Sequence, residues 1–348
     1  MINPGNKKSN VNPSFSLATK GQKPVDYYLN GLASGDRYIL SETITLLESI
    51  LFKKRQLGVE ILSKLPENSQ ATIRIGITGT PGVGKSTFIE AFGLFLISKG
   101  HKPAILAIDP SSQKTKGSIL GDKTRMEQLS IHKEAFIRPT ATNNILGGTA
   151  AVTKESIHIC ESAGYDIIIV ETVGVGQSET EVDNITDINI LLLQPGAGDD
   201  IQGIKRGIME NADIFVINKS DGPMVALARN TKTSYTNAIS LFHHEFSGWT
   251  CPVILCSSTE NTGIDEVYKA TMDYYHMATE DGFLTQKRDT QELKWFEKQS
   301  KLMILDKILS QKDIQDVYAN LLNAIQYQTI NTTEALRTFQ EKLSIIIK

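Results

Sequence analysis

The stretch ATIRIGITGTPGVGKSTFIEAFGLFLISKG, residues 71–100, decides the fold. Its first nine residues form a β-branched run that ends in glycine, which is typical of a short buried strand. GTPGVGKS, residues 79–86, then matches the pattern G-x-x-x-x-G-K-[ST], and a helix-like segment follows it. Glycines let backbone N–H groups turn toward phosphate oxygens without a Cβ in the way, and a helix N-terminus adds partial positive charge. The stretch therefore predicts a strand, a phosphate-binding loop and a helix.

Two residues of this loop carry specific chemistry. We expect the Lys85 ammonium to reach the β- and γ-phosphates of a nucleotide, and the Ser86 hydroxyl to serve as a Mg²⁺ ligand. The predicted nucleotide-binding residues of the loop are Gly79, Pro81, Gly82, Val83, Gly84, Lys85, Ser86 and Thr87. A structural glycine turn is the alternative, and the flanking strand and helix argue against it.

Five more strand-like runs follow this one along the chain. They are PAILAID (103–109), YDIIIVET (165–172), INILLLQPG (188–196), ADIFVINKSD (212–221) and CPVILCSS (251–258). Apolar strands that alternate with helical segments predict an α/β fold, with a mainly parallel central sheet covered on both faces. Polar residues follow the carboxyl ends of these strands, where open α/β sheets bind their ligands. The sequence thus predicts a P-loop NTPase.

The segment NKSD, residues 218–221, points to the base of the nucleotide. The Asp221 carboxylate can accept hydrogen bonds from N1–H and the 2-amino group of guanine. Adenine lacks this donor pair and would leave the carboxylate unpaired. We expect Asn218 to tie this segment to the phosphate loop and the stem of Lys219 to cover the base. Ser257 and Ser258, after the last strand, are predicted to approach guanine O6 through backbone N–H groups. A charged turn is the alternative for NKSD.

Three carboxylates are candidates for the metal. Asp109 and Glu171 end two of the predicted strands, and Asp122 lies in the loop segment GSILGDKTRM. Mg²⁺ prefers oxygen ligands and usually retains several waters. We therefore expect Mg²⁺ near Ser86, held directly or through water by some of these acids. For each single acid a solvated loop end remains the alternative.

Composition restricts the classes of partner. The chain has 348 residues, 40% of them hydrophobic, and a formal net charge of -3. This charge gives no general attraction to nucleic acid or to an anionic membrane, and no stretch is long and apolar enough to span a bilayer. The three cysteines are Cys160, Cys251 and Cys256, a sparse odd number that suits a reducing compartment and buried thiols. Without an apolar leader, the chain is expected to be cytoplasmic.

The chain divides into four segments by composition and periodicity. Residues 1–24 are rich in Asn, Ser, Pro and Lys and are predicted to be a disordered tail. Residues 25–70 are predicted to be a helical extension, residues 71–282 the nucleotide-binding domain, and residues 283–348 a helical arm. Thr332 and Thr333, before Glu334, resemble a helix N-cap.

The segment QPGAGDDIQGIKRGIMEN, residues 194–211, combines a glycine-rich acidic loop with Lys205 and Arg206. The residues alone favour a loop followed by a helix cap. A segment that senses the nucleotide or contacts a partner is the alternative.

Several long motifs together resemble one family. GTPGVGKST, DPSS followed by GSILGDKTRM, ETVGVGQSE, PGAGDDIQGIKRGIME and NKSD are similar to the motifs of the MeaB/MMAA family. Its members are GTPases that act as chaperones for adenosylcobalamin-dependent methylmalonyl-CoA mutase. The resemblance extends over residues from about 30 to 340.

The resemblance implies several roles that the residues alone do not establish. It implies that Lys85, Asp109 and Glu171 take part in GTP hydrolysis, with Asp109, Asp122 and Glu171 around Mg²⁺ in different nucleotide states. It makes residues 194–205 a switch that responds to the mutase, with candidate residues Gln194, Asp199, Gln202 and Lys205. It also implies a homodimer built through the C-terminal helices, and a client that is methylmalonyl-CoA mutase or a related acyl-CoA mutase.

Departures and alternatives qualify this resemblance. Residues 113–117 read QKTKG where the family has Pro-Phe-Thr-Gly-Gly, residues 140–145 lack the usual arginine, and Ser258 stands where alanine is common. A nickel-insertion GTPase is an alternative that needs a Cys/His cluster. A nucleotide-dependent kinase of a transport protein is another, and Asp221 argues against its use of ATP.

Overall fold

The computed structural model describes residues 23–66, 72–109, 126–141, 148–172, 182–196, 206–241 and 244–346. Within these ranges, seven strands form one sheet in the order β3-β2-β4-β1-β5-β6-β7. The strands are β1 (Ile73–Gly79), β2 (Pro103–Asp109), β3 (Phe136–Ala141), β4 (Ile167–Glu171), β5 (Ile188–Leu193), β6 (Ile214–Ile217) and β7 (Val253–Leu255). Every pairing between them is parallel. The predicted parallel α/β fold is confirmed.

Strand β3 is the one strand of this sheet that the sequence analysis missed. It pairs with β2 alone, with Ala107 opposite Pro139, and forms an edge of the sheet. Proline has no N–H to donate, so a proline within a run argues against a central strand but is tolerated at a sheet edge. Pro139 sits in FIRPTA, a short run that therefore gives a weak strand signal.

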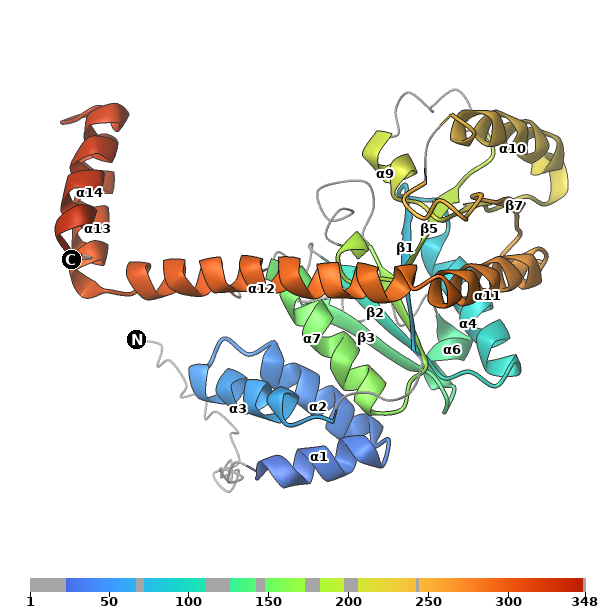
Figure 1. The fold of residues 1–348 in the computed structure, drawn as a ribbon, viewed down its shortest axis with the longest axis horizontal. Coiled ribbons are helices and arrows are strands. Elements are labelled where there is room, and N and C mark those ends of the chain that lie inside the picture. The colour runs from blue at the N-terminus through green and yellow to red at the C-terminus, as the bar shows by residue number, and fades with distance from the viewer. Residues whose placement is uncertain are drawn as a thin grey trace, which may run out of the picture.

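Helices cover both faces of the sheet (Figure 1). The helices α4 (Lys85–Ser98), α6 (Glu127–Ile131) and α11 (Ile264–Glu280) share one core with the sheet. On the other face lie α1 (Val25–Ala33), α2 (Arg37–Leu47), α3 (Phe52–Ser63) and α7 (Gly148–Ser162), with α9 (Arg206–Glu210), η3 (Gly222–Met224) and α10 (Val225–Ile239). Strand β4 shows the alternation that this requires: Ile167 and Ile169 face the first core, and Ile168 and Val170 the second.

The helical N-terminal region is confirmed, but it consists of three helices rather than one continuous pattern. Gly35, with φ of 71°, ends the turn after α1. The Asp36 carboxylate then accepts hydrogen bonds from the backbone N–H of Tyr38 (2.8 Å) and Ile39 (3.2 Å) at the start of α2. Such side-chain capping satisfies N–H groups that have no partner within the helix. Leu40 and Ile44 of α2 are fully buried against the sheet core.

The C-terminal helices α12 (Phe283–Leu309), α13 (Lys312–Gln326) and α14 (Thr332–Ile346) form an arm that extends away from the sheet (Figure 1). The expected helical arm is therefore present. The cap of α14 differs from the expectation: the backbone N–H of Glu334 donates to the Asn331 side chain (2.8 Å), so Asn331, rather than Thr332 or Thr333, supplies the capping oxygen.

A buried ion pair fixes the base of the arm. The Arg288 guanidinium on α12 donates to both carboxylate oxygens of Asp187 (2.8 and 2.6 Å) and to the Thr72 carbonyl (2.7 Å). The Asp187 side chain is fully buried. Gln291, one turn further, donates to the carbonyls of Asp183 and Thr186 (both 2.8 Å). These bonds orient the first turns of α12 against residues 183–187, because a paired buried charge tolerates little displacement.

The cysteines are free thiols, as expected. Cys160 and Cys256 are buried in the core, and Cys251 is half-buried. Burial raises the pKa of the Cys256 thiol to about 12, so it stays protonated at neutral pH. A search of the described helices for one with the length and apolarity of a membrane span found none.

Candidate functional site

The phosphate loop joins β1, which ends at Gly79, to α4, which begins at Lys85. Gly84 caps α4 with φ of 94°, in the left-handed region that favours glycine. A Cβ on Gly84 would also lie 2.8 Å from the Asn218 amide nitrogen. Val83 is fully buried and anchors the loop in the core. The loop conformation therefore depends on both glycine and an apolar side chain.

Lys85, Ser86 and Glu171 lie together at the carboxyl edge of the sheet. The Lys85 ammonium donates to the carbonyls of Gly79 (2.7 Å) and Thr80 (3.4 Å). The Ser86 hydroxyl donates to the Glu171 carboxylate at the end of β4 (3.2 Å). Burial lowers the pKa of Lys85, while the negative charge of Glu171 opposes that shift. A cation, a hydroxyl and a carboxylate from two elements thus share one small region.

Asn218, directly after β6, connects three loops through its side-chain amide. Its nitrogen donates to the Val83 carbonyl of the phosphate loop (2.9 Å). Its oxygen accepts from both the hydroxyl (2.7 Å) and the backbone N–H (3.2 Å) of Ser258, after β7. Asn218 is 2% exposed, so these bonds form away from water, where losing one is costly.

Lys219, on the exposed side, also connects the loop after β6 to the phosphate loop. It has φ of 57°, in the left-handed region, and its ammonium donates to the Gly82 carbonyl (2.6 Å). A positive φ on a residue with a side chain is uncommon and requires support from its surroundings. Here the bond to Gly82 and the neighbouring Asn218 contacts supply that support.

Asp221 is oriented by hydroxyl groups of the loop after β7. The Ser257 hydroxyl donates to the Asp221 carboxylate, and Thr259 donates to the same oxygen at 3.4 Å. Ser257 is fully buried and forms an antiparallel bridge with Thr262. Sequence reasoning had assigned Ser257 a backbone role and had missed Thr259, because side-chain contacts between distant loops leave no periodic signal in the sequence.

The loop after β7 folds back tightly enough to require a glycine. Gly263 has φ of 76°, and a Cβ there would lie 2.1 Å from the Leu255 carbonyl oxygen. This close approach returns the chain to α11 directly behind Ser257 and Ser258. The position of the serines beside Asn218 and Asp221 therefore depends on Gly263 as well.

The remaining predicted residues divide into those that the structure describes and those that it does not. Asp109 ends β2, two residues beyond Ala107, which pairs with Glu171, so its backbone reaches the same sheet edge. Thr87, in α4, is exposed. Gln194, directly after β5, is exposed as well. The Gly196 N–H donates to the Thr231 hydroxyl on α10 (3.0 Å). Asp122, Asp199, Gln202 and Lys205 lie outside the described residues, as do residues 113–117 and 142–145 of the departures.

Within the described part of the chain, no group of three or more His, Cys, Asp and Glu side chains is arranged to hold a metal ion.

Comparison with known proteins identifies relatives along most of the chain. A family model described as "Methylmalonyl Co-A mutase-associated GTPase MeaB" matches residues 40–313. The GTPase ArgK of Escherichia coli is 43% identical over 313 residues, which are 89% of this chain and 94% of that protein. A mouse protein named methylmalonic aciduria type A homolog, mitochondrial, is 44% identical over 80% of this chain and 70% of its own length.

A solved structure supports the same similarity. The crystal structure of a protein titled LAO/AO transport system kinase superposes with a TM-score of 0.72 and 35% sequence identity. The match covers 92% of this chain and 97% of that protein.

The Asn218 contacts generate a prediction. Asn218→Ala should lower the affinity for GDP about 10- to 100-fold, because it leaves the Val83 carbonyl and the Ser258 hydroxyl without their partner. Calorimetric titration with GDP measures this affinity. Ser258→Ala is the matched control, since it removes the hydroxyl donor to Asn218 but keeps the backbone N–H donor and the bond to Val83, and its loss of affinity should be smaller. An Asn218→Ala protein that binds GDP as tightly as the wild type would contradict the assignment.

Proposed function

The chain belongs to the MeaB family of methylmalonyl-CoA mutase-associated GTPases, and from this membership we propose that it is a chaperone of a cobalamin-dependent mutase. The client is methylmalonyl-CoA mutase or a related acyl-CoA mutase. The chain uses GTP to gate the loading of adenosylcobalamin and to protect or reactivate that enzyme. The name of the mouse relative and the description of the family model support a role associated with the mutase.

The nucleotide part of this proposal rests on the hydrogen bond between Asn218, in the loop after β6, and Val83, in the phosphate loop. The loop after β6 also contains Asp221, and we call it the base loop. The protein is a GTPase and binds guanine nucleotide. We assign the base to Asp221, which Ser257 and Thr259 orient, and the phosphates to the loop around Lys85. Asn218 fixes these two loops relative to each other, so one nucleotide can contact both at the same time.

The residues near Ser86 suit a magnesium ion. The Ser86 hydroxyl and the Glu171 carboxylate are oxygen donors 3.2 Å apart, and Mg²⁺ selects oxygen ligands. We propose that Ser86 and Glu171 hold Mg²⁺ directly or through water, together with Asp109 and Asp122. An ion held there would supply positive charge to offset the charge of the nucleotide phosphates.

Hydrolysis then follows from charge stabilisation. Water attacks the γ-phosphate, and negative charge spreads over the phosphate oxygens in the transition state. The Lys85 ammonium exchanges its bonds to the loop carbonyls for bonds to these oxygens. The backbone N–H groups at the start of α4 point the same way. Lys85 is half-buried, which limits competition from water for these bonds.

We propose that residues 194–205 report the nucleotide state to the mutase, with Gln194, Asp199, Gln202 and Lys205 as the contributing residues. The bond from Gly196 to Thr231 supports this assignment, because it anchors the start of the segment to α10. Gln194 directly follows β5, which pairs with β1 of the phosphate loop. The segment therefore begins beside the phosphate loop.

The arm supports the proposal of a homodimer. Large apolar side chains of α12–α14 are exposed, among them Leu293 (71%), Phe296 (68%), Met303 (66%), Ile304 (61%) and Leu336 (65%). An extended row of such side chains indicates a surface that another protein covers. We propose that the arm of a second copy covers it.

A kinase function has less support. The solved relative is titled a transport system kinase, and its similarity supports the shared fold. The Asp221 carboxylate, oriented by Ser257, favours guanine over adenine and so argues against a kinase that uses ATP.

The proposed interaction with the mutase predicts that the mutase changes the rate of GTP hydrolysis. Saturating mutase should raise the GTP hydrolysis rate by at least about tenfold, as activating proteins do for other GTPases. Phosphate release at increasing mutase concentration measures this rise. Lys205→Ala should remove most of the rise without changing GDP affinity, whereas Lys232→Ala, on the exposed side of α10, should leave it intact. Hydrolysis that saturating mutase does not change would contradict the proposed function.

The proposed homodimer predicts the molar mass of the protein in solution. Light scattering at micromolar concentration should give twice the 38.4 kDa of one chain. Ile304→Asp on α12 should favour the monomer, because it places a charge in the proposed apolar contact. Leu241→Asp, at a similarly exposed residue (82%) away from the arm, should remain dimeric. A wild-type protein with the mass of one chain would refute the dimer.

A further inference from the structure

The turn between α2 and α3 exposes three consecutive large apolar residues. Ile50 is 79% exposed, Leu51 58% and Phe52 79%, and we call these three residues the apolar tip. Further along α3, Leu57 and Ile61 are buried in the core, and Val59 is exposed. Single exposed apolar residues are common, but a contiguous group on a protruding turn indicates an interaction site.

The apolar tip is held in a fixed conformation. The Leu51 N–H donates to the Ser49 hydroxyl (3.2 Å), and the Leu51 carbonyl accepts from the N–H groups of Lys54 (2.9 Å) and Arg55 (3.1 Å). The Arg55 guanidinium donates to the Leu47 carbonyl and forms an ion pair with Glu155 on α7 (3.0 Å). A turn that is ordered before binding loses little conformational entropy when a partner covers it.

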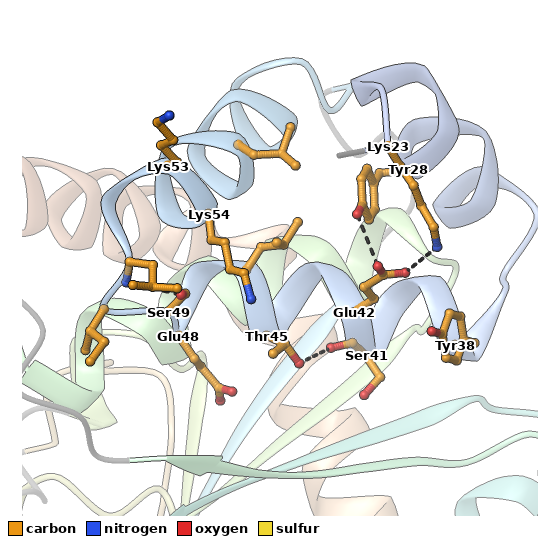
Figure 2. A pocket seen from close by; sticks show the side chains of 14 residues that line it. Lys23, Tyr28, Tyr38, Ser41, Glu42, Thr45, Glu48, Ser49, Lys53 and Lys54 are labelled. Atoms are coloured by element: carbon orange, nitrogen blue, oxygen red, sulfur yellow. Dashed lines mark hydrogen bonds and ion pairs between the residues drawn. The ribbon is translucent and has the colours of Figure 1, made fainter. Parts of the chain in front are cut away.

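A groove of about 1030 Å³ lies beside the apolar tip (Figure 2). Ser41 and Thr45 of α2 lie on one side of it, and Lys53 and Lys54 of α3 on the other. Figure 2 shows Lys54 pointing across the groove toward α2 and Lys53 pointing away from it. The groove thus combines the Ser41 and Thr45 hydroxyl groups, the Lys54 ammonium group and, from the apolar tip, Ile50 and Leu51.

The two glutamates beside the groove form ion pairs, whereas the two lysines do not among the described residues. Glu42 accepts from Lys23 (2.9 Å) and Tyr28 (3.2 Å), and Glu48 forms an ion pair with Arg138. Lys53 and Lys54 are exposed, and among the described residues neither has an ion pair. The surface therefore has two cations available for a partner with carboxylates.

The apolar tip lies near the edge strand β3, on the side of the sheet where the strands end and where the proposed nucleotide site lies. Arg37, at the start of α2, donates to the His132 carbonyl before β3 begins (3.2 Å). Arg138, within β3, donates to Ser41 (3.0 Å) and forms its ion pair with Glu48, at the end of α2. Helix α2 therefore runs in the direction of β3, and the turn after it faces the carboxyl edge. Three strand spacings of about 4.8 Å separate β3 from β1, roughly 15 Å in all.

We propose that the apolar tip, together with Lys53 and Lys54, is a docking surface for the mutase, on a patch of the mutase that offers an apolar cavity rimmed by carboxylates. This inference rests on the proposed function. A partner that contacts the proposed switch segment after β5 lies at the carboxyl edge of the sheet, the side that the turn after α2 also faces. A protein partner fits better than a membrane, because two lysines on a chain of net charge -3 attract an anionic membrane only weakly.

The test compares Phe52→Ser with wild type in calorimetric titration with the mutase and in mutase-stimulated GTP hydrolysis. Phe52→Ser should bind the mutase roughly thirtyfold more weakly, as when a central apolar anchor is removed from an interface. Intrinsic GTP hydrolysis and thermal stability should not change, because the side chain contacts solvent. Ile131→Ser is the matched control, since Ile131 is 83% exposed at the end of α6 and should have no effect.

The lysines are tested in the same way. The double variant Lys53→Glu, Lys54→Glu should slow association with the mutase and reduce its dependence on salt. Lys269→Glu, an exposed lysine on α11, is the control.

The outcomes separate this inference from the proposed function. A wild-type protein that neither binds the mutase nor responds to it would refute the proposed function, and the docking surface with it. A wild type that responds, with Phe52→Ser responding equally, would overturn the docking surface alone. Unchanged mutase affinity in Phe52→Ser, with loss of wild-type binding to vesicles of anionic phospholipid, would assign the apolar tip to a membrane surface instead.

Discussion

The hydrogen bonds of the Asn218 amide are the interactions on which the proposed nucleotide site depends. Its two ends bond to Val83 and Ser258, so one side chain connects the loops after β1, β6 and β7. Strand β5 separates β1 from β6, and the two loops have no backbone pairing of their own. The bonds of Asn218 are buried, and their geometry therefore sets the distance between the phosphate loop and the loop that contains Asp221.

The sheet connects this site to the rest of the molecule at two further places. Arg138 of β3 bonds to α2 and so ties the N-terminal helices, with the apolar tip, to the edge strand of the sheet. Asp187, just before β5, holds Arg288 at the start of the arm. Both contacts are ion pairs with a buried partner, which resist displacement because separation would leave a charge without compensation. The N-terminal helices and the base of the arm are thus each held against the sheet, the arm at the amino end of β5.

Much of this architecture follows from local sequence signals, and the remainder depends on tertiary contacts. Six strands were predictable from β-branched runs, and the loop at Gly79–Ser86 from its glycines, but Pro139 concealed the edge strand β3. Helical periodicity predicted the N-terminal region without its breaks at Gly35 and Ser49. The hydroxyls on Asp221 and the exposure of Phe52 were not predictable, because each depends on how distant segments pack.

The central claim is that Asp221 makes this site specific for guanine. Competitive binding of GTP, ATP and xanthosine triphosphate to the wild type and to Asp221→Asn tests it most directly. The wild type should prefer GTP over ATP by at least about 100-fold, since adenine leaves a carboxylate unpaired. Asp221→Asn should shift its preference toward the xanthine nucleotide, because the carboxamide donates to the carbonyl that replaces the 2-amino group. Equal competition by ATP in the wild type, or an unchanged preference for GTP in Asp221→Asn, would contradict the claim.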